Sequence, residues 1–167
     1  MKSDHGDGGL PGHLTSDSEL AGLGFLPLVP EAQGAVQLAD GAGMDWNTVG
    51  EVPDAPGHYL FTVEDGASTS VVYVGLTSHL SMVTRGILPR VGARGGQRYG
   101  RPQHAGATRK RVNIELAAQL GPGRSVRHWV RPMTAGATAA DTKRLLHDGE
   151  ERLILKWRLR EVGWNRG

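Results

Sequence analysis

The 167-residue sequence contains no cysteine. Disulfide frameworks, thiolate nucleophiles and sulfur-ligated zinc or iron–sulfur centres are excluded, because each needs a sulfur atom. Long hydrophobic runs are also missing: apolar stretches such as residues 22–29 are far shorter than the roughly 18–20 residues that span a bilayer. No basic and then apolar leader follows Met1. We therefore expect a cytoplasmic protein that does not interact with membranes.

Several catalytic signatures are absent as well. The seven histidines show neither the HExxH pattern nor any other paired-ligand spacing, so a zinc site is not expected. No GxSxG elbow and no GxxxxGK[ST] loop is present. Acyl transfer and nucleotide hydrolysis of those types therefore have no support.

Glycine, in contrast, is abundant, with 25 residues, and the charges are divided along the chain. Residues 1–54 hold nine acidic side chains against one lysine, a net charge of −8, whereas residues 55–167 hold eighteen basic side chains against eight acidic ones, a net charge of +10. We predict that residues 1–50 form an acidic, partly disordered lead-in and that residues 51–167 form the functional domain. Within the lead-in, the apolar residues of segment 18–29 could dock on that domain.

Hydrophobic patterning predicts the elements of this domain. Residues 57–63 and 70–74 are rich in strand-forming side chains and are joined by a short polar connection, which indicates an antiparallel hairpin. Apolar residues recur with helical spacing over 108–120, alternate over 125–131, and return to helical spacing over 138–161. The predicted fold class is α+β, with a small three-stranded mixed sheet flanked by helices.

Basic side chains are concentrated in residues 85–131, which contain eleven of them and only one acidic residue, Glu115. Ten are arginines, whose planar guanidinium can donate two hydrogen bonds to one phosphate. This segment predicts DNA as the partner, although a merely solvated basic surface has the same composition. We expect the following side chains to contact nucleic acid: Arg94, Arg98, Arg101, Arg109, Lys110 and Arg111.

Four motifs follow one another in chain order. The predicted hairpin carries Gly57-His58-Tyr59 on its first strand and Tyr73-Val74-Gly75 on its second. A later E-x-x-L-I pattern begins at Glu150, and Trp164-Asn165-Arg166 contains an asparagine near the end of the domain. In this order the motifs resemble those of the GIY-YIG nuclease superfamily, and the resemblance covers residues 56–167. His58 departs from the usual Ile or Val.

The resemblance implies a metal-dependent endonuclease that hydrolyses DNA. It gives Tyr59, with Tyr73 nearby, the role of activating water, and it gives Glu150 the role of holding Mg²⁺ or Mn²⁺. An arginine would stabilise the transition state, and there are two candidates. Arg90 has the context L-x-R-V that is usual in the family but lies fifteen residues beyond Gly75, a longer separation than is typical, whereas Arg85 lies ten residues beyond Gly75. Asn165 would complete the site. His104 could donate to phosphate or assist proton transfer.

Two other functions fit the same residues. The domain could be a nucleic-acid-binding module in which the altered spacing has disabled catalysis. It could also be an interaction protein whose acidic lead-in covers its own basic surface. Cleavage of DNA with Mg²⁺ distinguishes the nuclease from both of these alternatives.

Overall fold

The computed structural model describes residues 9–29, 32–38, 41–46, 55–80, 107–120 and 124–166. Its main sheet is antiparallel and has the strand order β1-β6-β5-β7-β2, and a separate hairpin is formed by β3 and β4. The strands are β1 (His13–Thr15), β2 (Leu26–Val29), β3 (Ala32–Leu38), β4 (Gly41–Trp46), β5 (Gly57–Glu64), β6 (Thr69–Thr77) and β7 (Ser125–Pro132). The helices are α1 (Asp17–Gly22), α3 (Ala107–Leu120) and α4 (Ala139–Lys156).

The three strands predicted from the sequence are the middle of this sheet. β5 pairs with β6 along one side and with β7 along the other, so it is the central strand. The turn between β5 and β6 contains Gly66 at φ 93°, a left-handed conformation that glycine adopts without steric cost. Strand-forming residues over β5 and β6, and alternation over β7, are sufficient to predict this part of the fold.

The predicted small three-stranded mixed sheet is wrong in size and in direction. The main sheet has five strands and every pairing in it is antiparallel, although the α+β class is correct. Both additional strands come from the acidic lead-in: β1 pairs with β6 and β2 pairs with β7. These segments are short and interspersed with glycine and proline. They gain their ladder hydrogen bonds from the open edges of the central strands, which local sequence does not reveal.

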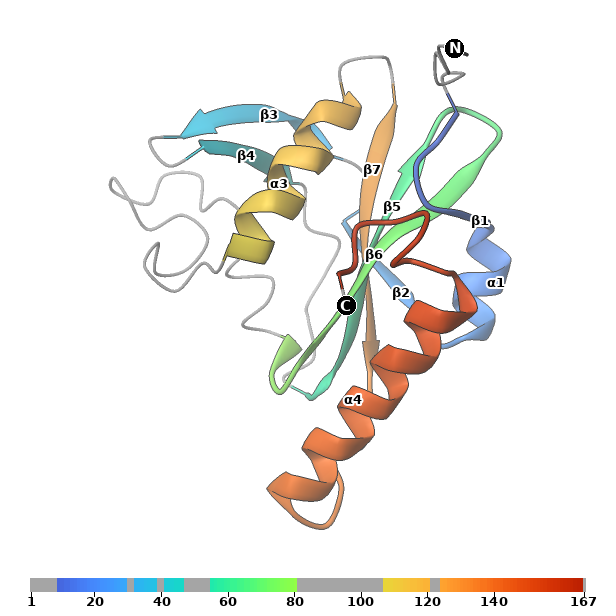
Figure 1. Ribbon diagram of the computed structural model, residues 1–167, viewed down its shortest axis with the longest axis vertical. Coiled ribbons are helices and arrows are strands. Elements are labelled where there is room, and N and C mark those ends of the chain that lie inside the picture. Colours follow the sequence, from blue (N-terminus) through green and yellow to red (C-terminus); the bar gives the residue numbers. More distant parts are fainter. Residues whose placement is uncertain are drawn as a thin grey trace, which may run out of the picture.

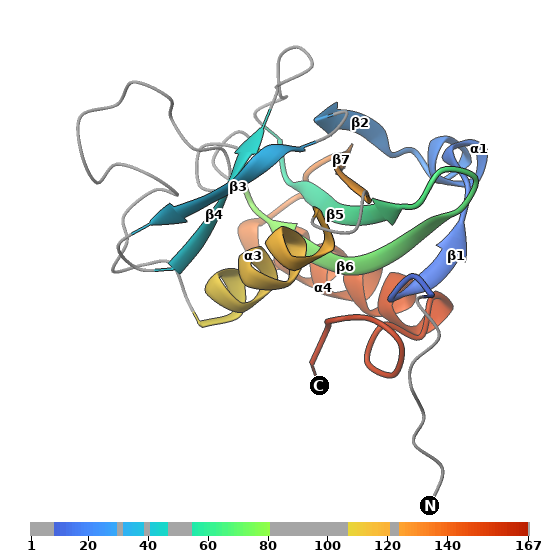
Figure 2. The same ribbon diagram turned by 90° about the horizontal axis from the view of Figure 1, so that it is seen from above.

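Helices cover the sheet on both faces, as Figures 1 and 2 show. Helix α3 lies on one face, next to β3 and β4, and its Val112 and Leu116 pack with Phe61 and Val72 of the sheet. Helix α4 lies on the opposite face, where Ile154 packs among the following side chains: Leu20, Leu60, Val74 and Trp129. The sheet therefore separates two hydrophobic cores.

Helix α4 begins with a cap and runs unbroken through Gly149. The Thr138 side chain accepts a hydrogen bond from the backbone N–H of Asp141, which satisfies one of the free donors of the first turn. A Cβ atom at Gly149 would lie 2.6 Å from the His58 ring, so the glycine lets the helix approach β5. His58 donates from Nε2 to the Leu146 carbonyl at 2.9 Å and accepts at Nδ1 from Arg131. In the described part of the chain, no helix is long and apolar enough to cross a membrane.

Arginines of the basic segment have structural partners, and Arg127 and Arg131 show this on β7. Arg127 on β7 forms ion pairs with Asp17 of α1 and with Glu64 of β5, and its guanidinium lies 4.5 Å from the centre of the Trp129 ring. Arg131 contacts His58 and the Leu23 carbonyl. Part of the positive charge of residues 85–131 therefore holds the lead-in against the sheet.

His128 on β7 makes stability depend on pH. Its ring is fully buried, stacks on Phe61 at 4.8 Å, and has its pKa lowered by burial to about 3. The unfolded chain takes up a proton below about pH 6.5, whereas the folded protein does not do so until about pH 3. Stability should therefore fall as pH decreases through this interval, by up to about 1.4 kcal/mol per pH unit for this histidine.

The substitution His128→Gln removes this titration. The free energy of unfolding, measured with urea, should fall less between pH 7 and pH 5 in this variant than in the parent. This comparison of pH slopes holds even if the variant and the parent differ in stability at pH 7. His147→Gln, at an exposed position on α4, is the control. Equal pH slopes for the parent and His128→Gln would contradict the prediction.

Candidate functional site

The β5–β6 hairpin places two tyrosines on the face that α3 covers. Tyr59 is paired with Gly75, and Phe61 is paired with Tyr73. A Cβ atom at Gly75 would lie 2.3 Å from Cζ and 2.5 Å from the hydroxyl of Tyr59, so the Tyr59 ring crosses directly over this glycine. The rings of Tyr59 and Tyr73 are 6.2 Å apart between centroids. The two triplets of the hairpin thus form one packed unit.

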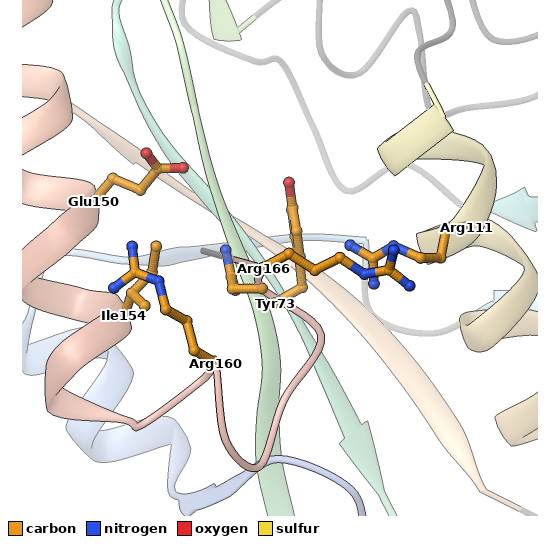
Figure 3. A pocket seen from close by; sticks show the side chains of 7 residues that line it. Tyr73, Arg111, Glu150, Ile154, Arg160 and Arg166 are labelled. Carbon is orange, nitrogen blue, oxygen red and sulfur yellow. The ribbon is translucent and has the colours of Figure 1, made fainter.

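A pocket of about 300 Å³ opens beside β6 (Figure 3). Its wall comes from one strand, both long helices and the C-terminal segment. The lining residues are Tyr73, Arg111, Glu150, Ile154, Arg160, Asn165 and Arg166. Three guanidinium groups and one carboxylate give this wall a net positive charge, which suits a phosphate group.

Glu150 reaches the pocket because of its position on α4. It lies one helical turn before Ile154, which is buried against the sheet, so both residues are on the inner side of the helix. Burial raises the pKa of the Glu150 carboxyl, and the neighbouring carboxylate of Glu151 acts in the same direction, whereas His147 and Arg160 oppose the shift. Figure 3 shows the carboxylate on the side of the pocket that faces Tyr73.

Glu151 points outward and forms an ion pair across the end of the helix. Its two oxygens accept hydrogen bonds of 2.8 and 2.7 Å from Nη1 and Nη2 of Arg160. This interaction lowers the pKa of Glu151 and raises that of Arg160. The turn after α4 thereby brings Arg160 back to the pocket wall.

Asn165 holds the C-terminal segment on the edge of β6. Its Oδ1 accepts from the Val74 N–H at 3.0 Å and its Nδ2 donates to the Val74 carbonyl at 2.8 Å. The Trp164 N–H also donates to the Val72 carbonyl at 2.7 Å. Because the Asn165 side chain is buried and committed to the backbone, its geometry supports a positioning role that carries Arg166 to the pocket.

Replacing Asn165 with alanine should release this segment. Both Val74 backbone groups would lose their partner, and we expect the free energy of unfolding to fall by about 1–3 kcal/mol. Urea unfolding measures the change. Arg166→Ala, at the exposed neighbouring position, is the matched control and should unfold like the parent. An Asn165→Ala variant with the parent's midpoint would show that the two hydrogen bonds contribute no net stability.

The structure brings together part of the site that the sequence predicted. Tyr73, Glu150, Asn165 and Arg111 line one pocket, and Tyr59 packs beside Tyr73. Arg109 and Lys110 belong to the first turn of α3. The remaining predicted residues lie outside the described part of the chain: Arg85, Arg90, Arg94, Arg98, Arg101 and His104.

Sequence reasoning missed Arg160 and Arg166 as members of the pocket wall. Arg160 lies ten residues beyond Glu150, after the end of α4, and no local pattern reports that the chain turns back there. Arg166 could have been found from the sequence, because it directly follows the asparagine of the terminal motif. The buried His128, which contacts Tyr59 at 5.8 Å between centroids, was also not singled out.

Glu150 is the residue of the pocket wall that could hold a metal ion. Among the described residues that line it, Glu150 is the one carboxylate, and no hydrogen bond or ion pair to another described residue occupies its oxygens. The described part of the chain contains no group of three or more His, Asp or Glu side chains suited to a metal. Mg²⁺ needs no such cluster, because it binds through one or two carboxylates together with water and substrate phosphates.

Comparisons of the chain with models of protein families, with curated proteins and with solved structures give no match. The assignment of function therefore depends on the motifs of the sequence and on the geometry of the pocket.

Proposed function

We propose that this protein is a metal-dependent endonuclease that hydrolyses DNA phosphodiester bonds with a site of the GIY-YIG type. One observation carries the proposal. Tyr73, Glu150 and Asn165 were selected by motifs that are up to 92 residues apart in the sequence, and all three line a single pocket. The same cavity has an excess of guanidinium groups, as a site for a phosphodiester would need.

The reaction requires three things of this pocket: a group that orients the attacking water and takes its proton, positive charge for the phosphate in the transition state, and positive charge for the leaving oxygen. A water oxygen forms a bond to phosphorus while the bond to the leaving deoxyribose oxygen breaks. The proton lost by the water passes to solvent, and the leaving oxygen takes up a proton from solvent. The resemblance gives the role of activating water to Tyr59, but of the two tyrosines it is Tyr73 that lines the pocket, with Tyr59 packed beside it. The hydroxyl group of Tyr73 can therefore orient the water and accept its proton. The hydroxyl group of a tyrosine is a weak base at neutral pH, so its main contribution is to orient the water.

The arginines of the wall supply the remaining binding. Arg111, Arg160 and Arg166 donate hydrogen bonds to the non-bridging oxygens of the phosphate, where negative charge increases in the transition state. Glu150 would hold Mg²⁺ or Mn²⁺, which supplies positive charge for the leaving oxygen. Asn165 maintains the pocket by fixing the C-terminal segment to β6.

The second candidate is a DNA-binding module without catalysis. The observation in its favour is the charge of the wall, because three arginines retain a polyanion whether or not the bond is cut. This reading predicts salt-dependent DNA retention in EDTA and no product with any divalent cation.

Nicking of supercoiled plasmid with Mg²⁺, and its absence in EDTA, tests the proposal. A panel of linear, nicked, branched and single-stranded DNA then identifies the substrate structure. A protein that retains DNA but never cuts it with Mg²⁺ or Mn²⁺ is the binding module. Cleavage that persists in EDTA would contradict the metal dependence.

A further inference from the structure

Arg160 lies within reach of two adjacent carboxylates and is bound to only one of them. Its guanidinium donates two hydrogen bonds to Glu151, at 2.8 and 2.7 Å, while Glu150 shares the pocket wall with it. Among the described residues, Glu150 has no such partner. The positions of the two carboxylates follow from the helix, since successive residues lie roughly 100° apart around its axis. Glu151 is therefore at the surface while Glu150 is turned toward the pocket.

The choice of partner matters because an arginine is always charged and pairs readily with a free carboxylate. If the Arg160 guanidinium moved onto Glu150, it would occupy the oxygens that a divalent cation needs and would introduce a like charge next to that cation. The bidentate pair with Glu151 opposes this movement. It also leaves three of the five guanidinium N–H groups available to the pocket.

We propose that Glu151 is a positioning residue that holds Arg160 away from Glu150. In this arrangement Glu150 stays available to a divalent cation, and Arg160 stays directed at the phosphate. The inference rests on the proposed function and extends it. Of the two adjacent glutamates of α4, Glu150 binds the cation and Glu151 positions the arginine. Glu151, which the motif alone treats as a neighbour of the functional residue, becomes part of the site.

Binding of Mn²⁺ tests the inference independently of cleavage, with free Mn²⁺ measured by electron paramagnetic resonance at low salt. Glu151→Gln should weaken Mn²⁺ binding about tenfold, because the released Arg160 competes for Glu150. The double variant Glu151→Gln with Arg160→Gln should regain an affinity close to the parent's, since the competitor is gone. This restoration is not expected if Glu151 merely stabilises the helix.

Glu161→Gln is the control. Glu161 is exposed and forms an ion pair with Arg158, and neither residue belongs to the pocket wall. The variant should bind Mn²⁺ like the parent. Thermal unfolding of all variants separates a loss of cation binding from a loss of fold.

The outcomes distinguish this inference from the proposed function. A Glu151→Gln variant with the parent's Mn²⁺ affinity, or a double variant as weak as Glu151→Gln alone, overturns the inference and leaves the nuclease proposal intact. A parent that binds Mn²⁺ through Glu150, responds to Glu151→Gln as expected, and cleaves no DNA contradicts the nuclease proposal alone. A parent that binds no more Mn²⁺ than its Glu150→Gln variant, with or without a DNA oligonucleotide to supply phosphates, contradicts both.

Discussion

Glu150→Gln should abolish Mg²⁺-dependent nicking while leaving the protein folded and able to retain DNA. Glutamine keeps the length and nearly the shape of the side chain but removes the charge that attracts a divalent cation. We expect the nicking rate to fall by about 10²-fold or more, the range seen when one electrostatic contact to a transition state is lost. Burial raises the pKa of this carboxyl, so a neutral side chain should cost no stability.

Three measurements on the variant and the parent make this prediction specific: the nicking rate with Mg²⁺, DNA retention in EDTA, and the thermal midpoint. Glu161→Gln is the appropriate control because it removes an exposed carboxylate outside the pocket wall. Glu151→Gln is not neutral, since it also releases Arg160. An active parent whose rate is unchanged by Glu150→Gln would exclude Glu150 as the metal ligand.

Gly75→Ala should disrupt the site from within the sheet. The new methyl group would lie 2.3 Å from Cζ of Tyr59, closer than two carbon atoms can approach, so the tyrosine ring must move. The ring packs against Phe61, Tyr73 and His128, which leaves it little room. We expect a loss of about 1–3 kcal/mol in the free energy of unfolding, as for other overpacked positions, together with a loss of nicking.

Urea unfolding and plasmid nicking measure the two effects of Gly75→Ala. Gly22→Ala is the matched control, because outside its own helix no atom of the described residues lies within 4 Å of the added methyl group. Combining Gly75→Ala with Tyr59→Ala removes the clash, so the two losses of stability should be less than additive. Full additivity, or a Gly75→Ala protein as stable as the parent, would mean that the Tyr59 ring does not lie over Gly75 in solution.

Local sequence determined the elements at the centre of the protein. Residues of β5, β6 and β7 alternate or cluster as strand formers, and that pattern depends only on which side chains face the two cores. The same is true of α4, where the Thr138 cap and the spacing of Leu146, Leu153 and Ile154 specify a helix. Glu150 could be placed on this helix for the same reason.

Only the tertiary structure decided the edges of the sheet and the wall of the pocket. β1 and β2 are too short to be recognised alone and exist because β6 and β7 offer them hydrogen bonds. The contact between Asn165 and Val74 spans 91 residues, and Arg160 reaches the pocket through a turn after α4. Such contacts depend on where the chain reverses direction. The periodicity of apolar residues indicates only which side of a helix or strand is buried. The sequence therefore supplied the tyrosine, glutamate and asparagine of the candidate site, and the fold added the two arginines that accompany them.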